Sequence, residues 1–222
     1  MKNLKKLPAI IAVSTLLSSS ALADKPFIAL GLNVATTGIG VEARAPITDN
    51  IYGRIGANYF KYTHRFTSGK INLKGDLTLL SAPIMFDWHP FDKSGFRLSA
   101  GVAYNGTKLK ASGSANGVTI NGKSFSAAQI GSVTAKLTLG NAIAGVASIG
   151  YDSSFISNRP LSFDFELGAM YAGKPKLSVS STGTGGDVFL KEYRKDADKS
   201  FNDIKKYLKF YPIIKIGVKY AF

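Results

Sequence analysis

The residues in this chain that could perform chemistry are few: two histidines, no cysteines and a modest number of acids. His64 lies in the segment KYTHRF and His89 in DWHPF, near opposite ends of two neighbouring predicted strands. If those strands cross an apolar layer of roughly 25 Å, the two imidazoles cannot share a metal ion or a catalytic site. The lack of cysteine excludes thiol catalysis, disulfides and cysteine-ligated metals.

A hydrolase built on His64 would need a nucleophilic serine and an acid or amide that orients the imidazole. The neighbouring residue is Thr63, and no serine lies beside it. We therefore predict no enzymatic activity, no catalytic residues, no metal site and no cofactor. A lipid hydrolase around His64, at the outer rim of the predicted strands, is the less favoured alternative.

A simpler interpretation assigns both histidines to interfaces. His64 would be an interfacial residue beside Tyr62 and Arg65, and His89 would belong to an aromatic girdle with Trp88 and Phe91.

Most of the chain alternates apolar and polar residues with a period of two, as β-strands do. In 96–105 and 161–171 the polar face mixes Gly, Ala and Ser with charges of both signs, while the apolar face has aromatic residues toward its ends. A narrow lumen lined by small and paired charged residues, inside a lipid-facing wall, requires this pattern. We therefore predict an all-β transmembrane barrel and prefer it to a soluble β-sandwich.

The turns give the number of strands. Short turns are predicted at 46–50, 90–95 and 152–160, and longer outer connections at 66–74, 111–132 and 181–206. Between them lie predicted strands at 51–65, 75–89, 96–110, 133–151, 161–180 and 208–222. The apolar phase changes between Val34 and Ile39, which requires either a turn between two short strands, 27–34 and 38–46, or one bulged strand. We favour the turn, because it gives an eight-stranded antiparallel barrel with both chain ends on one side.

The last outer connection differs from the others. Leu190, Tyr193, Ala197, Phe201 and Ile204 recur at steps of three and four residues, which predicts a short amphipathic helix. We expect its apolar stripe to pack over the mouth of the barrel. The alternative is a surface that is presented to a partner.

The first 23 residues have the features of a secretory signal peptide: a lysine-rich start, an apolar stretch and the close ALA. Cleavage is predicted between Ala23 and Asp24, which leaves 24–222 as a single barrel domain. The alternative, a membrane anchor, needs about 20 apolar residues, more than this stretch provides.

The chain is basic, with 28 Lys and Arg against 14 Asp and Glu. For an exported protein this charge favours anionic lipid headgroups and lipopolysaccharide phosphates as partners over nucleic acid. The alternative is that the lysines only solvate the loops.

The strand phase predicts two charged sets. The predicted lumen network consists of Glu42, Arg44, Arg54, Asp76, Arg97, Lys136, Asp164, Glu166, Lys215 and Lys219. In an eight-stranded barrel these charges would form a plug. The alternative is a narrow path for ions. A predicted outer basic collar, at the height of lipopolysaccharide phosphates, consists of Lys61, Arg65, Lys70, Lys74, Lys108, Lys110, Lys174 and Lys176.

With the ALA site, the TDN turn at 48–50 and the closing KYAF, the chain resembles the small eight-stranded outer-membrane β-barrels of Gram-negative bacteria, the OmpA/OmpW-like class. The resemblance implies residence in the cell outer membrane. It also implies that Val218, Tyr220 and Phe222 form the signal that the barrel-assembly machinery recognises. Such barrels serve as structural links, channels, adhesins or, occasionally, lipid-modifying enzymes. We expect an envelope-structural or surface-interaction role, with a narrow porin-like channel for small solutes as the alternative.

Overall fold

The computed structural model describes residues 28–68, 71–91, 93–114, 117–120, 122–155, 160–192 and 207–222. The predicted signal peptide, with its cleavage site between Ala23 and Asp24, lies outside the described residues, as does Lys70. None of the helices in the described ranges is long and apolar enough to cross a membrane.

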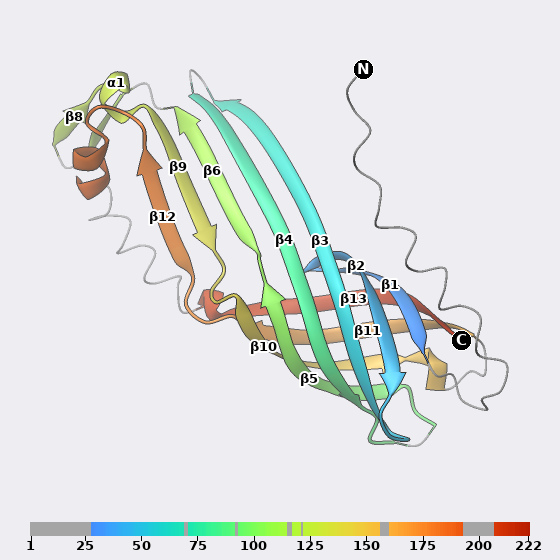
Figure 1. Ribbon diagram of the computed structural model, residues 1–222. Helices are drawn as coiled ribbons and strands as arrows, with labels where there is room; N and C mark the ends of the chain where they lie inside the picture. The colour runs from blue at the N-terminus through green and yellow to red at the C-terminus, as the bar shows by residue number, and fades with distance from the viewer. Residues whose placement is uncertain are drawn as a thin grey trace, which may run out of the picture.

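Eight strands form a closed antiparallel barrel, as the sequence predicts (Figure 1). In order around the wall they are β1 (Ala29–Ala35), β2 (Gly38–Pro46), β3 (Ile51–Ser68), β4 (Ile71–Trp88), β5 (Phe96–Asn105), β10 (Ile143–Asp152), β11 (Leu161–Tyr171) and β13 (Phe210–Ala221). Pairing of β13 with β1 closes the wall. Short connections join β2 to β3, β4 to β5 and β10 to β11, and the last includes the 3-10 turn η2 (Ser153–Phe155).

The phase change near the start of the chain is a turn between two strands. Residues 36 and 37 form the turn between β1 and β2, and Ala35 pairs with Gly38 across it. Gly38 has a φ of 124°, a conformation that favours glycine. The bulged-strand alternative is therefore wrong.

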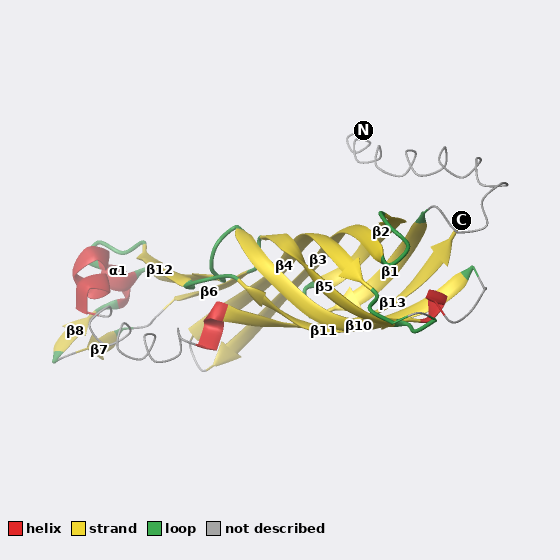
Figure 2. Ribbon diagram, turned by 90° about the horizontal axis from the view of Figure 1, so that it is seen from below, coloured by secondary structure: helices red, strands yellow, loops and turns green. Residues whose placement is uncertain are grey.

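On one side of the barrel the wall continues beyond the rim as a second, open sheet of five strands (Figures 1 and 2). The outer parts of β3 and β4 pair onward with β6 (Lys108–Ser114), β9 (Ser132–Thr138) and β12 (Lys176–Ser181), in the order β3-β4-β6-β9-β12. We call this sheet the extension. The extension carries the described parts of the segments that are predicted as the longer outer connections.

The extension corrects several predicted boundaries. The strands predicted at 96–110, 133–151 and 161–180 each divide at the rim into a barrel strand and an extension strand. The loop predicted at 66–74 is mostly strand, because β3 and β4 are 18 residues long. Alternation is present on both sides of the rim, so no loss of the pattern marks the division between the two sheets.

A small cluster closes the far end of the extension. The hairpin β7 (Val118–Ile120) and β8 (Lys123–Phe125) leads into α1 (Ala127–Ile130), which Ser126 caps. A helix between β12 and β13 begins at Gly186 and is described to Glu192. Its Phe189 packs against Phe125 and Ile130.

A helix in the last connection was therefore predicted correctly, but its described part packs at the tip of the extension and not over the barrel mouth. The rest of the predicted apolar stripe, from Tyr193 to Ile204, lies outside the described residues. The 3-10 turn η3 (Tyr207–Lys209) then leads into β13.

Candidate functional site

The barrel wall separates an apolar outside from a charged inside. Along β10 every second residue is buried, and the residues between them are exposed. The exposed positions on the wall include the apolar residues Leu32, Ile55, Ile84, Phe86 and Phe163, which are 56 to 65% exposed. Small and charged residues point into the lumen, where eight strands leave just enough width for side chains to fill the space.

Ten ionised side chains meet in the lumen, at the end that contains the short turns, the first described residue Ile28 and the C-terminal Phe222. Within the described part of the chain there are five bases and five acids, so the set is neutral overall. The bases are Arg44, Arg54, Arg97, Lys215 and Lys219, and the acids are Glu42, Asp87, Asp152, Asp164 and Glu166. Each is at most 7% exposed.

Arginine side chains join acids from several strands. Arg54 binds Asp87 with two hydrogen bonds, of 2.9 and 3.0 Å, and its Nη1 lies 2.9 Å from Glu166 Oε2. Arg97 Nη2 lies 2.6 Å from Asp164 Oδ2 and 2.7 Å from Glu166 Oε2. These contacts connect β3, β4, β5 and β11 through the centre of the barrel.

The two lysines of β13 complete the network. Lys215 Nζ lies 2.6 Å from Glu42 Oε2 and 3.0 Å from Glu166 Oε2. Lys219 Nζ lies 2.9 Å from Asp152 Oδ2 and 3.2 Å from Glu42 Oε1. The structure thus places eight of the ten predicted lumen residues in one ion-pair network, which lets these charges remain ionised although they are buried.

Two members of the network, Asp87 and Asp152, were not predicted, and neither was the contact of His89 with the network. Asp87 alternates with the exposed Phe86 and Trp88, so strand phase could have identified it. Asp152 was assigned to a turn, although it continues the buried phase of β10. His89 was predicted for an aromatic girdle, but it is 4% exposed and its Nε2 contacts Arg44 Nη2.

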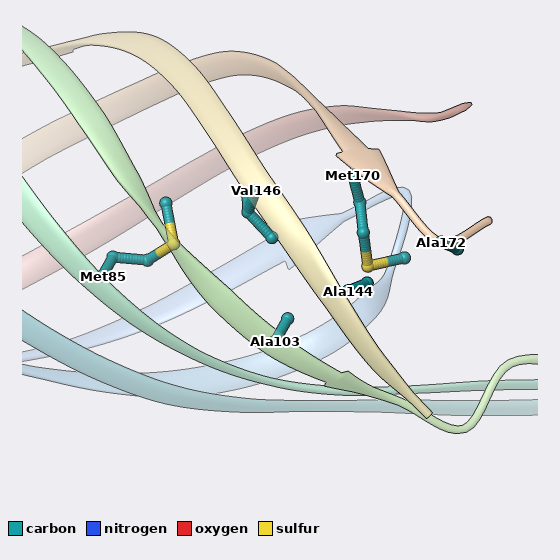
Figure 3. Packing of buried hydrophobic residues seen from close by; sticks show 6 residues of the cluster. All are labelled: Met85, Ala103, Ala144, Val146, Met170 and Ala172. Atoms are coloured by element: carbon teal, nitrogen blue, oxygen red, sulfur yellow. The ribbon is translucent and has the colours of Figure 1, made fainter. Parts of the chain in front are cut away.

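An apolar belt lies farther along the lumen, toward the extension (Figure 3). Met85 and Met170 point into it, and small residues complete it. The buried members are Met85, Ala103, Ala144, Val146, Met170 and Ala172, with Tyr211 and Ile213 packed against them. Methionine fills irregular spaces well, and here the two side chains occupy the part of the lumen without ion pairs.

Little space remains between the network and the belt. A cavity of about 30 Å³ lies between them, lined by Glu42, Arg54, Asn58, Met85 and Lys215 among others. A cavity needs about 10–15 Å³ for each water molecule, so this one has room for about two.

The extension has one basic face. A groove of about 580 Å³ on this face is lined by Lys61, Lys74, Asp76, Thr78, Lys108, Lys110, Thr134, Lys136, Ser178 and Ser180. We call this set the basic groove. The predicted collar residues Lys61, Lys74, Lys108 and Lys110 all belong to it.

The structure corrects the assignment of two predicted lumen residues. Asp76 and Lys136 lie in the basic groove and not in the lumen. The hydroxyl of Thr63 donates a hydrogen bond of 2.6 Å to Asp76, and Lys74 Nζ lies 3.1 Å from the same carboxylate. The hydrogen bond and the neighbouring ammonium lower the pKa of Asp76 below its ordinary value.

The other collar residues are spread more widely. Arg65 pairs with Lys74 across β3 and β4, and Lys176 pairs with Thr138 across β12 and β9, so both lie on the extension. Lys174 is an exposed residue of the link between β11 and β12 and does not line the groove.

The two histidines lie in different environments. His64 is in the outer part of β3, stacked on the ring of Tyr62 with 6.2 Å between ring centroids, and its Nδ1 lies 3.5 Å from the Tyr62 hydroxyl. His89 follows β4 at the other end of the barrel. Among the described residues, no cluster of histidines and acids has the arrangement of a metal site.

The last strand ends at the short-turn side of the barrel. Val218 and Tyr220 point outward and are 38 and 46% exposed. The Tyr220 and Phe222 rings are in edge contact at 4.8 Å, and the Phe222 amide donates a hydrogen bond to Ile28.

These features define a class: a small, closed, eight-stranded antiparallel barrel with an apolar outer wall and a filled polar lumen. Solved structures similar to this one include CarO2 of Acinetobacter baumannii. The two chains are 20% identical, with a TM-score of 0.57 over 90% of this chain and 100% of that one. Another is CarO of A. baumannii, at 21% identity and a TM-score of 0.56 over 89% of this chain and 98% of that one. The chain therefore has the fold of an eight-stranded outer-membrane barrel. No family model matches it, and no curated protein matches its sequence.

Proposed function

We propose that this protein is an integral protein of the bacterial outer membrane with an envelope-structural or surface-interaction role. The outward-facing apolar residues of all eight strands support the membrane location, because a soluble barrel would not expose Leu, Ile and Phe side chains around its whole wall. The predicted signal peptide agrees with export to that membrane.

The observation that supports this role most directly is the filled lumen. Five bases and five acids neutralise one another in it, and the methionine belt fills the section beyond them. A conducting pore needs a continuous polar path that ions can enter and leave. In this proposal the lumen is a plug, and the functional surface is the extension.

Single-channel recording from the refolded mature protein in a planar bilayer tests the proposal. The expected result is a silent membrane that contains correctly folded barrel, verified by its heat-dependent migration on a gel. A steady conductance that changes with Lys215→Gln or Glu166→Gln, but not with Lys93→Gln in an exposed turn, would support the narrow channel instead.

The proposal includes no enzymatic activity. Loss of a lipid-directed activity on His64→Ala, with the barrel still folded, would favour the rim hydrolase.

The barrel-assembly machinery is the proposed partner during biogenesis, with Val218, Tyr220 and Phe222 as the recognised residues. Deletion of Phe222 is expected to reduce outer-membrane assembly in cells while the purified chain still refolds in detergent. Equal loss in both assays would mean that Phe222 acts on barrel stability and not on recognition.

A further inference from the structure

We propose that the basic groove binds the phosphorylated saccharide headgroups of lipopolysaccharide in the leaflet around the barrel. The inference rests on the proposed membrane location and goes beyond it, because it assigns a ligand and a binding site to the extension. The groove recognises phosphate groups. Its position beside the lipid-facing wall points to the surrounding lipid as the source of these phosphates.

The groove begins immediately beyond the apolar wall. Tyr59 pairs with Leu80, and the next pair on the same face of β3 and β4 is Lys61 with Thr78. Two residues of a strand span about 7 Å. The first lysine therefore lies just above the last outward-facing aromatic residue, at the height where lipid headgroups begin.

The basic groove is on the face that continues the lipid-facing wall. Along β4 the exposed Phe86 and Ile84 have the same strand phase as Asp76 and Lys74. The opposite phase is buried in the lumen at Met85 and Asp87. A ligand in the groove therefore lies beside the barrel, where the membrane lipid is, and not over its mouth.

Basic residues face one another directly across neighbouring strands at the groove. Lys110 of β6 pairs with Lys136 of β9 inside the groove, and Lys74 of β4 pairs with Arg65 of β3, which does not line it. Like charges directly opposite on neighbouring strands destabilise a sheet. An anion that lies between them removes this repulsion, which is the physical reason to expect one here.

The chain itself supplies little counter-charge. Asp76 is the one acid among the groove-lining residues, and its ion pair is with Lys74. Within the described ranges, Lys61, Lys108, Lys110 and Lys136 have no carboxylate at ion-pair distance. Four ammonium groups are thus available to an external anion.

The groove also supplies hydroxyl donors in rows. One row of paired residues crosses β4, β6, β9 and β12 and consists of Asp76, Lys110, Lys136 and Ser178, of which Ser178 has the hydroxyl. In the next row Thr134 pairs with Ser180. Ammonium groups bind phosphate oxygens with strong charge-assisted hydrogen bonds, and the hydroxyls suit the saccharide. A volume of about 580 Å³ is within the range of ligand pockets, about 300–1,000 Å³.

Binding of fluorescent deep-rough lipopolysaccharide to the purified mature protein in neutral detergent tests the proposal, with anisotropy measured at low and high salt. The groove variant is Lys108→Gln, Lys110→Gln and Lys136→Gln combined. The matched control, Lys93→Gln, Lys174→Gln and Lys191→Gln combined, removes the same charge from exposed positions outside the groove. A third variant with arginine at 108, 110 and 136 keeps the charge.

We expect the groove variant to bind at least about tenfold more weakly, the change that follows the loss of one charge-assisted hydrogen bond. The control should change less than about twofold, since it leaves the groove intact, and the arginine variant should retain binding, because arginine also pairs with phosphate. High salt and enzymatic dephosphorylation of the lipopolysaccharide should each weaken binding.

Equal losses in the groove and control variants would reject the groove and leave net charge as the cause. Sodium polyphosphate that binds as tightly as lipopolysaccharide, at equal phosphate, would reject the lipid as ligand in favour of a soluble polyanion. Insertion of the unmodified protein into liposomes is measured separately. Its failure would overturn the proposed membrane location, whereas normal insertion without binding would overturn only the ligand.

Discussion

Arg54 and Glu166 meet at 2.9 Å although they stand on opposite sides of the barrel. In the closed order of strands, β4, β5 and β10 separate β3 from β11 in one direction, and β2, β1 and β13 separate them in the other. The ion pair therefore crosses the lumen from wall to wall. This contact helps to pack the barrel interior with side chains from opposite walls.

Replacement of Glu166 by glutamine should strongly destabilise the barrel. Glu166 accepts contacts from Arg54, Arg97 and Lys215, so its neutralisation leaves buried bases without compensation. Breaking a buried pair in this way costs about 3–5 kcal/mol. The free energy of unfolding, measured by urea titration in lipid vesicles, gives the effect directly.

The control is Asp187→Asn, at an exposed position of the 186–192 helix. Glu192 would be a poor control, because it is 5% exposed and its Oε1 lies 2.8 Å from Lys123 Nζ. If Glu166→Gln and Asp187→Asn cost the same, the lumen network does not stabilise the barrel.

The apolar belt should depend on methionine volume. Met85→Ala removes a side chain that is 2% exposed and leaves a cavity, which is expected to cost about 2–5 kcal/mol. Ile84→Ala, one residue earlier, truncates a side chain that is 56% exposed toward lipid and should cost clearly less in the same vesicles. A larger effect for Ile84→Ala would show that the belt contributes little packing.

The junction between the barrel and the extension should depend on Gly140. This residue has a φ of 71°, and a Cβ there would contact the carbonyl of Ala172. Gly140→Ala is expected to destabilise the junction by about 1–3 kcal/mol, the cost of a strained backbone conformation. Limited proteolysis should then cleave the extension faster. Gly145→Ala in β10, where a Cβ would have no neighbour within 4 Å, should leave the rate unchanged.

Asp76→Asn tests the groove in the opposite direction. Thr63 and Lys74 lower the pKa of Asp76 below its ordinary value, so the carboxylate stays ionised at neutral pH as an ordinary aspartate does. Its neutralisation removes the acid of the groove and releases Lys74, so lipopolysaccharide binding should become several-fold tighter. Thr119→Ala, in the β7–β8 hairpin away from the groove, should bind as the unmodified protein does. Weaker binding by Asp76→Asn would mean that the carboxylate itself contacts the ligand.

The strand pattern was sufficient to predict the barrel. The alternation of buried and exposed residues along β10 and β11 follows the sequence closely, because lipid and lumen impose opposite polarity on the two faces. The phase change between Val34 and Ile39 predicted the turn between β1 and β2, since a straight strand cannot change phase by one residue.

The misassignment of Asp76 has a physical origin in the change of surroundings at the rim. Along β4 the apolar residues are even-numbered in the barrel, at Ile84, Phe86 and Trp88, but odd-numbered in the extension, at Leu77 and Leu79. The strand does not change phase; its surroundings do, because the face that meets lipid in the barrel meets water and anions beyond it. Asp76 was therefore assigned to the wrong face.

Lys136 was misplaced for a related reason. It belongs to β9, which pairs with β6 and β12 in the extension and not with a barrel strand. Local alternation cannot distinguish two sheets that share neighbouring strands, because the distinction depends on long-range pairing.

The length of β3 and β4 has a consequence for how such a protein can diverge. Since each of these strands runs without interruption from the barrel into the extension, the barrel sets which face of the extension each residue occupies. One inserted or deleted residue near the rim of either strand would exchange those faces and turn Lys61 or Lys74 away from the membrane. Sequence change in this part of the surface should therefore proceed by substitution or by paired length changes, whereas the hairpin at the tip is free to vary in length.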